Sequence, residues 1–172
     1  TTLNKYDINP TFFINGEFIK RYPSETKQIS IYNFDCASMF FSAIDLTDNT
    51  FVIDEDFIRR GLARNEDEFY QITKKELSLF WHTPFFVKNQ MILSAGEKTG
   101  YIYVDIPEEL LQLQTNSAND DIEDLLSKYI NCVKENNAIV LPIQIGYSSQ
   151  ENKNLLYQHL DILICTLLKN GY

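Results

Sequence analysis

The chain has 172 residues, of which 44% are hydrophobic and 13% aromatic, and its formal net charge of −9 comes from 24 acids and 15 bases. This composition excludes a disordered chain and predicts a single globular domain over residues 1–172. The charge argues against nonspecific binding to nucleic acid or to an anionic membrane, because phosphate contacts need clustered Lys and Arg. Basic proteins are the partners that such a charge favours.

The three cysteines, Cys36, Cys132 and Cys165, are odd in number and widely spaced. Their spacing fits neither a disulfide framework nor a metal site, and the two histidines lie too far apart to add one. The scattered glycines form no phosphate-binding loop. We therefore expect free thiols, a cytoplasmic location, and neither a metal nor another cofactor.

The first part of the chain is expected to contain strands. Asn15-Gly16 lies between two apolar triplets and predicts a tight hairpin over residues 12–19. β-branched and aromatic residues predict a strand over residues 29–34. Residues 35–46 fit either a helix capped by Asp35 or a buried strand, so both alternatives stay open.

A short helix is expected next, because Asp54 stands at an N-cap position and Gly61 at a helix end. These two residues predict a helix over residues 55–60. The charged residues 64–68 then form a solvated connection to the next element.

The middle of the chain predicts a helix and a hairpin. Residues 73–76 match a capping box and predict a helix that runs through Trp81. Residues 90–94 and 101–106 flank a loop that contains two glycines, which predicts two antiparallel strands. Pro107 has the fixed φ of a first helical position and predicts a brief helix.

The clearest pattern is an apolar stripe at helical spacing, which predicts a helix that faces the core on one side. Its members are Ile122, Leu125, Leu126, Tyr129, Ile130 and Val133. Residues 138–145 alternate as a strand, which Pro142 confines to a sheet edge or a bulge. A capping box at Ser148 begins a last helix, which ends at Asn170-Gly171.

These elements predict an α+β fold in a single domain. We expect a mostly antiparallel or mixed sheet of about six strands, packed with four to five helices, with the C-terminal helix central to the core.

An acidic window lies between Lys98 and Lys128, where 29 residues contain no Lys or Arg. Its seven acids are Asp105, Glu108, Glu109, Asp120, Asp121, Glu123 and Asp124. On one surface they would attract a basic partner. The alternative is local, because acids in a first turn stabilise a helix N-terminus by about 0.3–1 kcal/mol each.

Tyr101, Tyr103 and Asp105 share one face of the strand predicted over residues 101–106. Tyr is common on half-exposed binding surfaces, so this face fits a recognition strip with Tyr101 and Tyr103 as anchors. The alternative is that a helix covers both rings and that their hydroxyl groups reach the edge of the core.

Cys36 is the candidate nucleophile with the most local support, since a helix N-terminus after Asp35 would lower the pKa of its thiol. His82 would then be its base. Against this, the neighbouring residues Ala37, Met39 and Phe40 are typical of a hydrophobic core. No sequence signature of a cysteine-enzyme family surrounds Cys36.

Small size, acidity, reduced cysteines, the acidic window and the absence of a catalytic motif together resemble the immunity proteins of contact-dependent growth-inhibition systems in bacteria. The resemblance implies a cytoplasmic inhibitor, not an enzyme, that occludes a cognate basic nuclease toxin as a monomer in a one-to-one complex. The seven acids would steer the toxin and the two tyrosines would anchor it. Two alternatives remain, an acidic type III secretion chaperone and a cysteine-dependent enzyme that uses Cys36.

Overall fold

The computed structural model describes residues 2–32, 34–50, 52–111, 122–136, 140–145 and 156–172. The chain divides into two compact units. Unit 1 comprises Thr1–Tyr6 and Ile106–Tyr172, and unit 2 comprises Asp7–Asp105. Each unit has hydrophobic clusters of its own. The prediction of one domain over residues 1–172 is not tested by this division.

Unit 2 contains a parallel sheet of four strands within the described residues. The strands are β1 (Thr11–Ile14), β2 (Asp35–Ser38), β3 (Phe80–Trp81) and β4 (Ile102–Tyr103), side by side in chain order. Each crossover thus moves the chain one strand further in the same direction. A doubly wound sheet reverses its order, whereas a stepwise order is typical of the wall of a β/α barrel.

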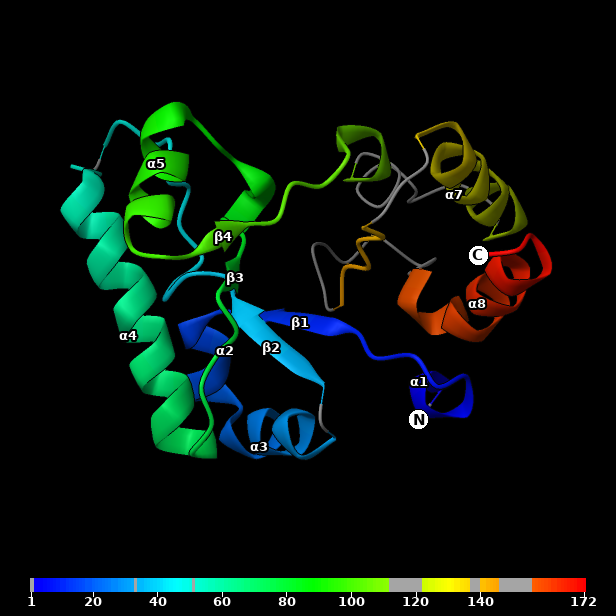
Figure 1. Ribbon diagram of the computed structural model, residues 1–172, viewed down its shortest axis with the longest axis horizontal. Helices are drawn as coiled ribbons and strands as arrows, with labels where there is room; N and C mark the ends of the chain where they lie inside the picture. Colours follow the sequence, from blue (N-terminus) through cyan, green and yellow to red (C-terminus); the bar gives the residue numbers. More distant parts are fainter. Residues whose placement is uncertain (1, 33, 51, 112–121, 137–139, 146–155) are drawn as a thin grey trace. The chain divides into compact units, whose positions relative to one another are not determined.

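Helices connect these strands and cover one face of the sheet. They are α2 (Gly16–Arg21) and α3 (Pro23–Ile31) after β1, α4 (Glu55–Thr73) after β2, and η1 (Pro84–Phe86) and α5 (Gln90–Lys98) after β3. Figure 1 shows α4 running the length of unit 2, with α5 beside its first half and α2 and α3 beside its second half. Trp81 is fully buried against Ile58, Leu62 and Ile92 of this helical layer.

Asp54 does cap a helix, as its position predicts, because its side chain accepts a hydrogen bond from Phe57 N at 2.8 Å. The helix continues far beyond Gly61, so residues 64–68 lie inside α4 rather than in a connection. Gly61 is a packing residue: a Cβ there would stand 2.1 Å from Cζ of Phe40. The helix ends at Lys74, which adopts a left-handed conformation with φ of 61°.

The predicted fold class is wrong, because the described sheet is parallel and has four strands, whereas the prediction is a mostly antiparallel or mixed sheet of about six strands. The predicted hairpin over residues 12–19 is a strand followed by a helix. Asn15 caps α2 through its Oδ1, which accepts from Phe18 N at 2.8 Å. Gly16 has no room for a side chain, since a Cβ would stand 2.5 Å from the Phe41 oxygen. The backbone of Phe41 approaches Gly16 too closely for a side chain, and this contact, not a tight turn, explains why a glycine stands at this position.

Three other strand and helix predictions in unit 2 are also wrong. Residues 29–31 end α3, residues 73–81 lead from the end of α4 into β3, and residues 90–94 begin α5. Asn89 caps α5 by accepting from Ile92 N at 2.9 Å. Within residues 35–46, Asp35–Ser38 forms β2, so the strand alternative is correct there.

Unit 1 is helical in its described part. It contains α1 (Thr2–Lys5), a helical turn at residues 108–111, α7 (Ile122–Asn136), η3 (Leu156–His159) and α8 (Leu160–Lys169). The apolar stripe of α7 is buried as predicted, with Tyr129 at the centre and its hydroxyl donating to the Pro142 oxygen at 2.7 Å. The Tyr6 hydroxyl lies 3.0 Å from Sγ of Cys165.

The described end of the predicted strand over residues 138–145 shows no strand structure. The predicted start of the last helix at Ser148 lies outside the described residues. The helix α8 packs Leu163 into the core of unit 1 but leaves Ile162 48% exposed, so it lies at the side of that core and not at its centre. In the ranges that the structure describes, no helix is both long enough and apolar enough to span a membrane.

Candidate functional site

The carboxyl ends of the four parallel strands meet at one edge of the sheet in unit 2. Parallel α/β folds bind ligands at this carboxyl edge, because the loops that follow the strands converge there. Met39, His82 and Val104 are the first residues beyond β2, β3 and β4. The carboxyl edge is therefore the place where a site is expected.

One side chain of α4 joins the carboxyl ends of β1 and β2. The fully buried Asn65 donates from Nδ2 to the oxygen of Ile14 at 2.9 Å and to Oγ of Ser38 at 2.8 Å. Ser38 Oγ also accepts from Phe40 N at 3.1 Å. The Oδ1 of Asn65 is buried and has no hydrogen-bond partner within the described part of the chain. We call this contact the Asn65 clamp.

His82 is buried at the end of β3, with only 2% of its surface exposed. Its Nδ1 lies 2.8 Å from the oxygen of Thr83. A carbonyl oxygen only accepts, so Nδ1 carries the proton and Nε2 is the acceptor. Nε2 faces the hydroxyl of Tyr103 at 3.4 Å. Burial lowers the pKa of His82 from its ordinary 6.5, although the Thr83 hydrogen bond opposes this. The ring is therefore neutral at pH 7.

Two hydroxyl groups lie beside this ring. Thr83 donates to the oxygen of Val87 at 2.5 Å, so its Oγ1 accepts in its 3.2 Å contact with the Tyr103 hydroxyl. Burial also raises the pKa of Tyr103, which keeps its proton. Thr83 Oγ1 therefore takes the single hydroxyl proton of Tyr103, and the other hydrogen bonds of His82 and Thr83 go to backbone oxygens.

The turn after β3 has a strained backbone. Phe85 and Phe86 have φ angles of 55° and 61°, in a region that bulky residues rarely adopt. Such a conformation costs about 1–3 kcal/mol for each residue. The ring of Phe86 packs edge-on against His82 with centroids 4.8 Å apart, whereas Phe85 is 63% exposed. Strain that holds a large ring in solvent is typical of a ligand contact.

Few of the residues that are predicted to bind a partner lie at this carboxyl edge in the structure. Tyr101 is buried, and its hydroxyl donates to Oε2 of Glu66 at 2.8 Å. Tyr103 belongs to the hydroxyl pair at the edge. Asp105 follows β4 and forms an ion pair with Lys88 at 2.5 Å. Tyr101 is thus part of the core and Tyr103 is half-buried, and whether either tyrosine contacts a partner stays a prediction.

The other predicted acids belong to unit 1. Glu108 and Glu109 are exposed at the start of the helical turn, and Glu123 and Asp124 are exposed in the first turn of α7. Asp124 pairs with Lys128 of the next turn at 2.6 Å. Asp120 and Asp121 lie outside the described residues. Whether any of these acids contacts a partner stays a prediction.

Cys36 does not have the environment of a nucleophile. It is buried within β2, and burial together with nearby Asp35 raises the pKa of its thiol to about 11. The backbone of Cys36 pairs with Ser78, whereas His82 pairs with Ser38 at the opposite end of β2. His82 is thus not its base. Cys36, Cys132 and Cys165 are free thiols, and no finding tests the cytoplasmic location expected from them.

Sequence reasoning missed Asn65 and Phe85 as residues of the edge. A polar Asn among the apolar positions of an amphipathic helix signals a buried hydrogen bond, but the charged residues around Asn65 predict an exposed connection over residues 64–68. Phe85 has no local signal in the sequence, since its left-handed φ and its 63% exposure are features of the folded structure.

A family model for polysaccharide deacetylases matches residues 1–104, which is more than half of the chain and includes every strand of the sheet. The chain belongs to the polysaccharide deacetylase family. The matched residues build the carboxyl edge described above, so that edge is a feature of the deacetylase domain.

Two curated relatives match this polysaccharide deacetylase domain. The peptidoglycan-N-acetylmuramic acid deacetylase PdaA of Bacillus subtilis is 30% identical over 99 residues, which are 58% of this chain and 36% of the relative. An uncharacterized 30.6 kDa protein of Geobacillus stearothermophilus is 26% identical over the same shares. The chain therefore spans about a third of the length of the curated relatives that it matches.

Solved structures of carbohydrate esterase family 4 share the fold. Bacillus subtilis PdaA has a TM-score of 0.73 at 24% identity, with 99% of this chain and 68% of that chain covered. A pseudoenzyme of this family from Bacillus anthracis has a TM-score of 0.72 at 16% identity, covering 99% and 54%. A cobalt-bound acetyl xylan esterase from Clostridium thermocellum has a TM-score of 0.69 at 16% identity, covering 99% and 76%.

The family assignment corrects the functional predictions. The chain is not an immunity protein, a type III secretion chaperone or a Cys36-dependent enzyme, because a family model for polysaccharide deacetylases covers most of it. The prediction that it is not an enzyme is also wrong at the level of the family, because the family model and the curated relative PdaA are both described as deacetylases. Acidity and reduced cysteines are whole-chain properties that deacetylase domains can share with immunity proteins.

The cobalt ion in one solved neighbour raises the question whether this deacetylase domain could hold a metal. Its described residues do not fit one: in those ranges, nowhere do three or more His, Cys, Asp or Glu side chains come together. His82 directs Nδ1 to a carbonyl oxygen, and Asp105 pairs with Lys88. The described edge instead combines aromatic rings and hydroxyl groups with the Asn65 amide, the His82 ring and the Lys88–Asp105 ion pair.

Proposed function

We propose that the chain acts on an acetylated polysaccharide of the peptidoglycan type and engages it at the carboxyl edge of unit 2. The observation that carries this proposal is the family match over residues 1–104, which spans all four strands of the sheet. The names of the relatives and neighbours share one ligand class, a polysaccharide that bears acetyl groups.

The exposed ring of Phe85 is the group at this edge that best suits a sugar. One face of a pyranose ring consists of C–H groups, and a flat aromatic ring buries that face while the hydroxyl groups stay in water. The Lys88–Asp105 ion pair stands on the neighbouring loops and presents a donor and an acceptor for hydroxyl or amide groups. Together these groups fit a neutral sugar chain.

The activity to measure is hydrolysis of the acetamido group, in which water adds to the acyl carbon and acetate leaves the sugar nitrogen. The full chain is incubated with peptidoglycan or with an N-acetylglucosamine oligomer, and the released acetate is quantified. Release above that of heat-denatured protein supports deacetylation.

A second candidate function is polysaccharide binding without hydrolysis. The observation that favours it is the edge itself, whose described side chains offer aromatic and hydroxyl groups but no set of metal ligands. A pseudoenzyme among the structural neighbours has the same fold. Co-sedimentation with insoluble peptidoglycan in the absence of acetate release would select this candidate.

A variant of Phe85 tests the edge itself. Replacing Phe85 with Ala should weaken co-sedimentation about tenfold, because the loss of an aromatic contact and its buried area is worth roughly 1–2 kcal/mol. The matched control is Tyr70→Ala, which removes a ring that is 50% exposed on α4. Equal retention of both variants, or no binding and no acetate release by the wild-type chain, would refute the proposal.

A further inference from the structure

A pocket of about 260 Å³ opens at the opposite, amino edge of the sheet in unit 2. Phe34 and Asp35 at the start of β2, Phe69 of α4, and Lys75, Glu76 and Ser78 of the segment before β3 line it. All of these residues precede the strands or flank them at their amino ends. This amino-edge pocket is therefore separate from the carboxyl edge.

The polar groups of the amino-edge pocket differ from those of the carboxyl edge in their availability. Lys75 donates from Nζ to the oxygen of Ser30, which holds its ammonium group against α3. Asp35 and Glu76 are exposed carboxylates. The Oγ of Ser78 is buried and has no hydrogen-bond partner among the described residues. The pocket thus presents two carboxylates and one restrained ammonium group, whereas the Ser78 hydroxyl is shielded from solvent.

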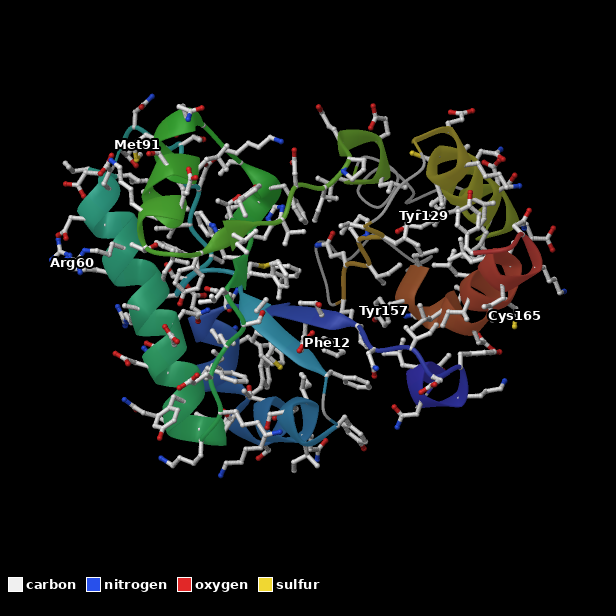
Figure 2. All side chains as sticks on the ribbon, viewed as in Figure 1. Phe12, Arg60, Met91, Tyr129, Tyr157 and Cys165 are labelled. Carbon is white, nitrogen blue, oxygen red and sulfur yellow. The ribbon has the colours of Figure 1, made fainter. Side chains whose placement is uncertain are left out.

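The Phe34 ring, which lines the amino-edge pocket, belongs to a small aromatic cluster. Phe34 stacks on Tyr32 with centroids 5.8 Å apart and an interplanar angle of 24°, and it contacts Phe12 at 5.6 Å. Tyr32 is 49% exposed. Figure 2 shows Phe12 near the amino ends of β1 and β2. The pocket therefore offers flat apolar faces beside an excess of negative charge.

We propose that the amino-edge pocket binds a cationic amino sugar unit, which is the product of deacetylation. Hydrolysis of an acetamido group breaks its C–N bond, adds water, and yields acetate and an amine that takes up a proton at neutral pH. The ammonium group pairs with Asp35 or Glu76, and the ring lies against Phe34, where a cation also gains from the aromatic face.

The pocket suits the amino sugar better than its acetylated form for two reasons. An acetamido group is neutral and gains nothing from the carboxylates, whereas the ammonium group gains a charge-assisted contact. The chain as a whole carries a net charge of −9, which attracts a cationic polymer. This inference rests on the proposed function for its ligand class, because only a deacetylase substrate makes amino sugars the relevant product.

The test is calorimetric titration of the full chain with two tetramers, one of glucosamine and one of N-acetylglucosamine. Glu76→Gln and Asp35→Asn should each weaken binding of the glucosamine tetramer about fivefold, as the loss of one partly exposed charge pair predicts. Neither change should alter binding of the N-acetylglucosamine tetramer, which Phe85→Ala should weaken. Glu97→Gln, which removes an exposed carboxylate of α5, is the matched control and should leave both affinities unchanged.

The two proposals fail in different ways. If the wild-type chain does not bind the glucosamine tetramer, or if Glu76→Gln and Asp35→Asn bind it like the Glu97→Gln control, the pocket inference is wrong. If the chain binds glucosamine through these carboxylates but neither binds nor deacetylates the acetylated tetramer, the proposed function of the carboxyl edge is wrong instead. Circular dichroism of each variant checks its fold, and Glu76→Gln alone decides the result if Asp35→Asn does not fold.

Discussion

The two edges of the sheet in unit 2 use polar side chains in opposite ways. At the carboxyl edge, Asn65, Thr83 and His82 are buried, and their contacts are mainly with the backbone and with each other. At the amino edge, Asp35 and Glu76 are exposed beside a pocket. Buried polar groups rigidify a structure when they are satisfied, whereas exposed ones are available to a ligand.

This difference means that stability and binding should separate between the edges. A change at the carboxyl edge removes contacts on which the strand ends depend, and it should lower the free energy of unfolding. A change at the amino edge should leave the fold intact and alter what the pocket binds. Four measurements test this contrast, from the largest expected effect to the smallest.

The largest effect is expected for Asn65→Ala. This change removes two buried hydrogen bonds and leaves a cavity between α4 and the ends of β1 and β2, which should cost about 2–4 kcal/mol. Urea unfolding measures it as a lower midpoint with an unchanged slope. Gln71→Ala, on the exposed side of α4, is the control and should change stability by less than about 0.5 kcal/mol. If Asn65→Ala lowers the free energy of unfolding no more than the control does, the Asn65 clamp does not stabilise the fold.

Cys36 should be almost inert to thiol reagents in the folded protein. Its pKa is raised from 9.0 to about 11, which lowers the thiolate fraction near pH 8 about a hundredfold, and burial slows access further. Mass spectrometry of alkylated peptides should find Cys36 modified only after addition of denaturant. Rapid labelling of the native chain would mean that the amino edge opens more than the structure shows.

The stability of the protein should fall as the pH drops below about 6.5, in part because of His82. Its folded pKa is lowered from 6.5, so the unfolded chain takes up a proton that the folded chain does not. The lost stability is at most about 1.4 kcal/mol for each pH unit between the unfolded and the folded pKa. His82→Gln should remove this part of the slope in urea titrations at pH 5, 6 and 7. An unchanged slope would show that another group is responsible.

The smallest stability effect is expected at the amino edge. Glu76→Gln removes an exposed charge and should change the free energy of unfolding by less than about 0.5 kcal/mol. The same variant is expected to bind the glucosamine tetramer more weakly. A loss of stability as large as that of Asn65→Ala would erase the contrast between the two edges.

The sequence predicts helices well where a long apolar stripe repeats. The stripe of α7 extends over three turns, so the helical period is unambiguous, and its residues are buried as expected. Asp54 is likewise recognised as a cap, because a carboxylate before a helix has one clear role. These elements depend on local contacts alone.

The sheet could not be predicted in the same way. The strands β3 and β4 have only two residues each, too few for an alternation to show. In the sequence, Gly16, Gly61 and Gly96 are interpreted as turn or end signals, yet each lies in a helix where a side chain would collide with a distant residue. Parallel pairing and close approach depend on long-range contacts, and so does the position of Phe85 in the site.

The Asn65 clamp also has a consequence for the order in which unit 2 folds. Ile14 and Ser38 are directly opposite in the β1–β2 ladder, so one amide touches both partners only when the two strands are in register. A slip of one residue would move one partner by about 3.3 Å and turn its side chain to the other face. The second half of α4 can therefore complete its packing only on correctly paired strands. The two hydrogen bonds of the Asn65 amide thus form late in folding, after β1 and β2 are aligned. Removing the amide should speed unfolding far more than it slows folding.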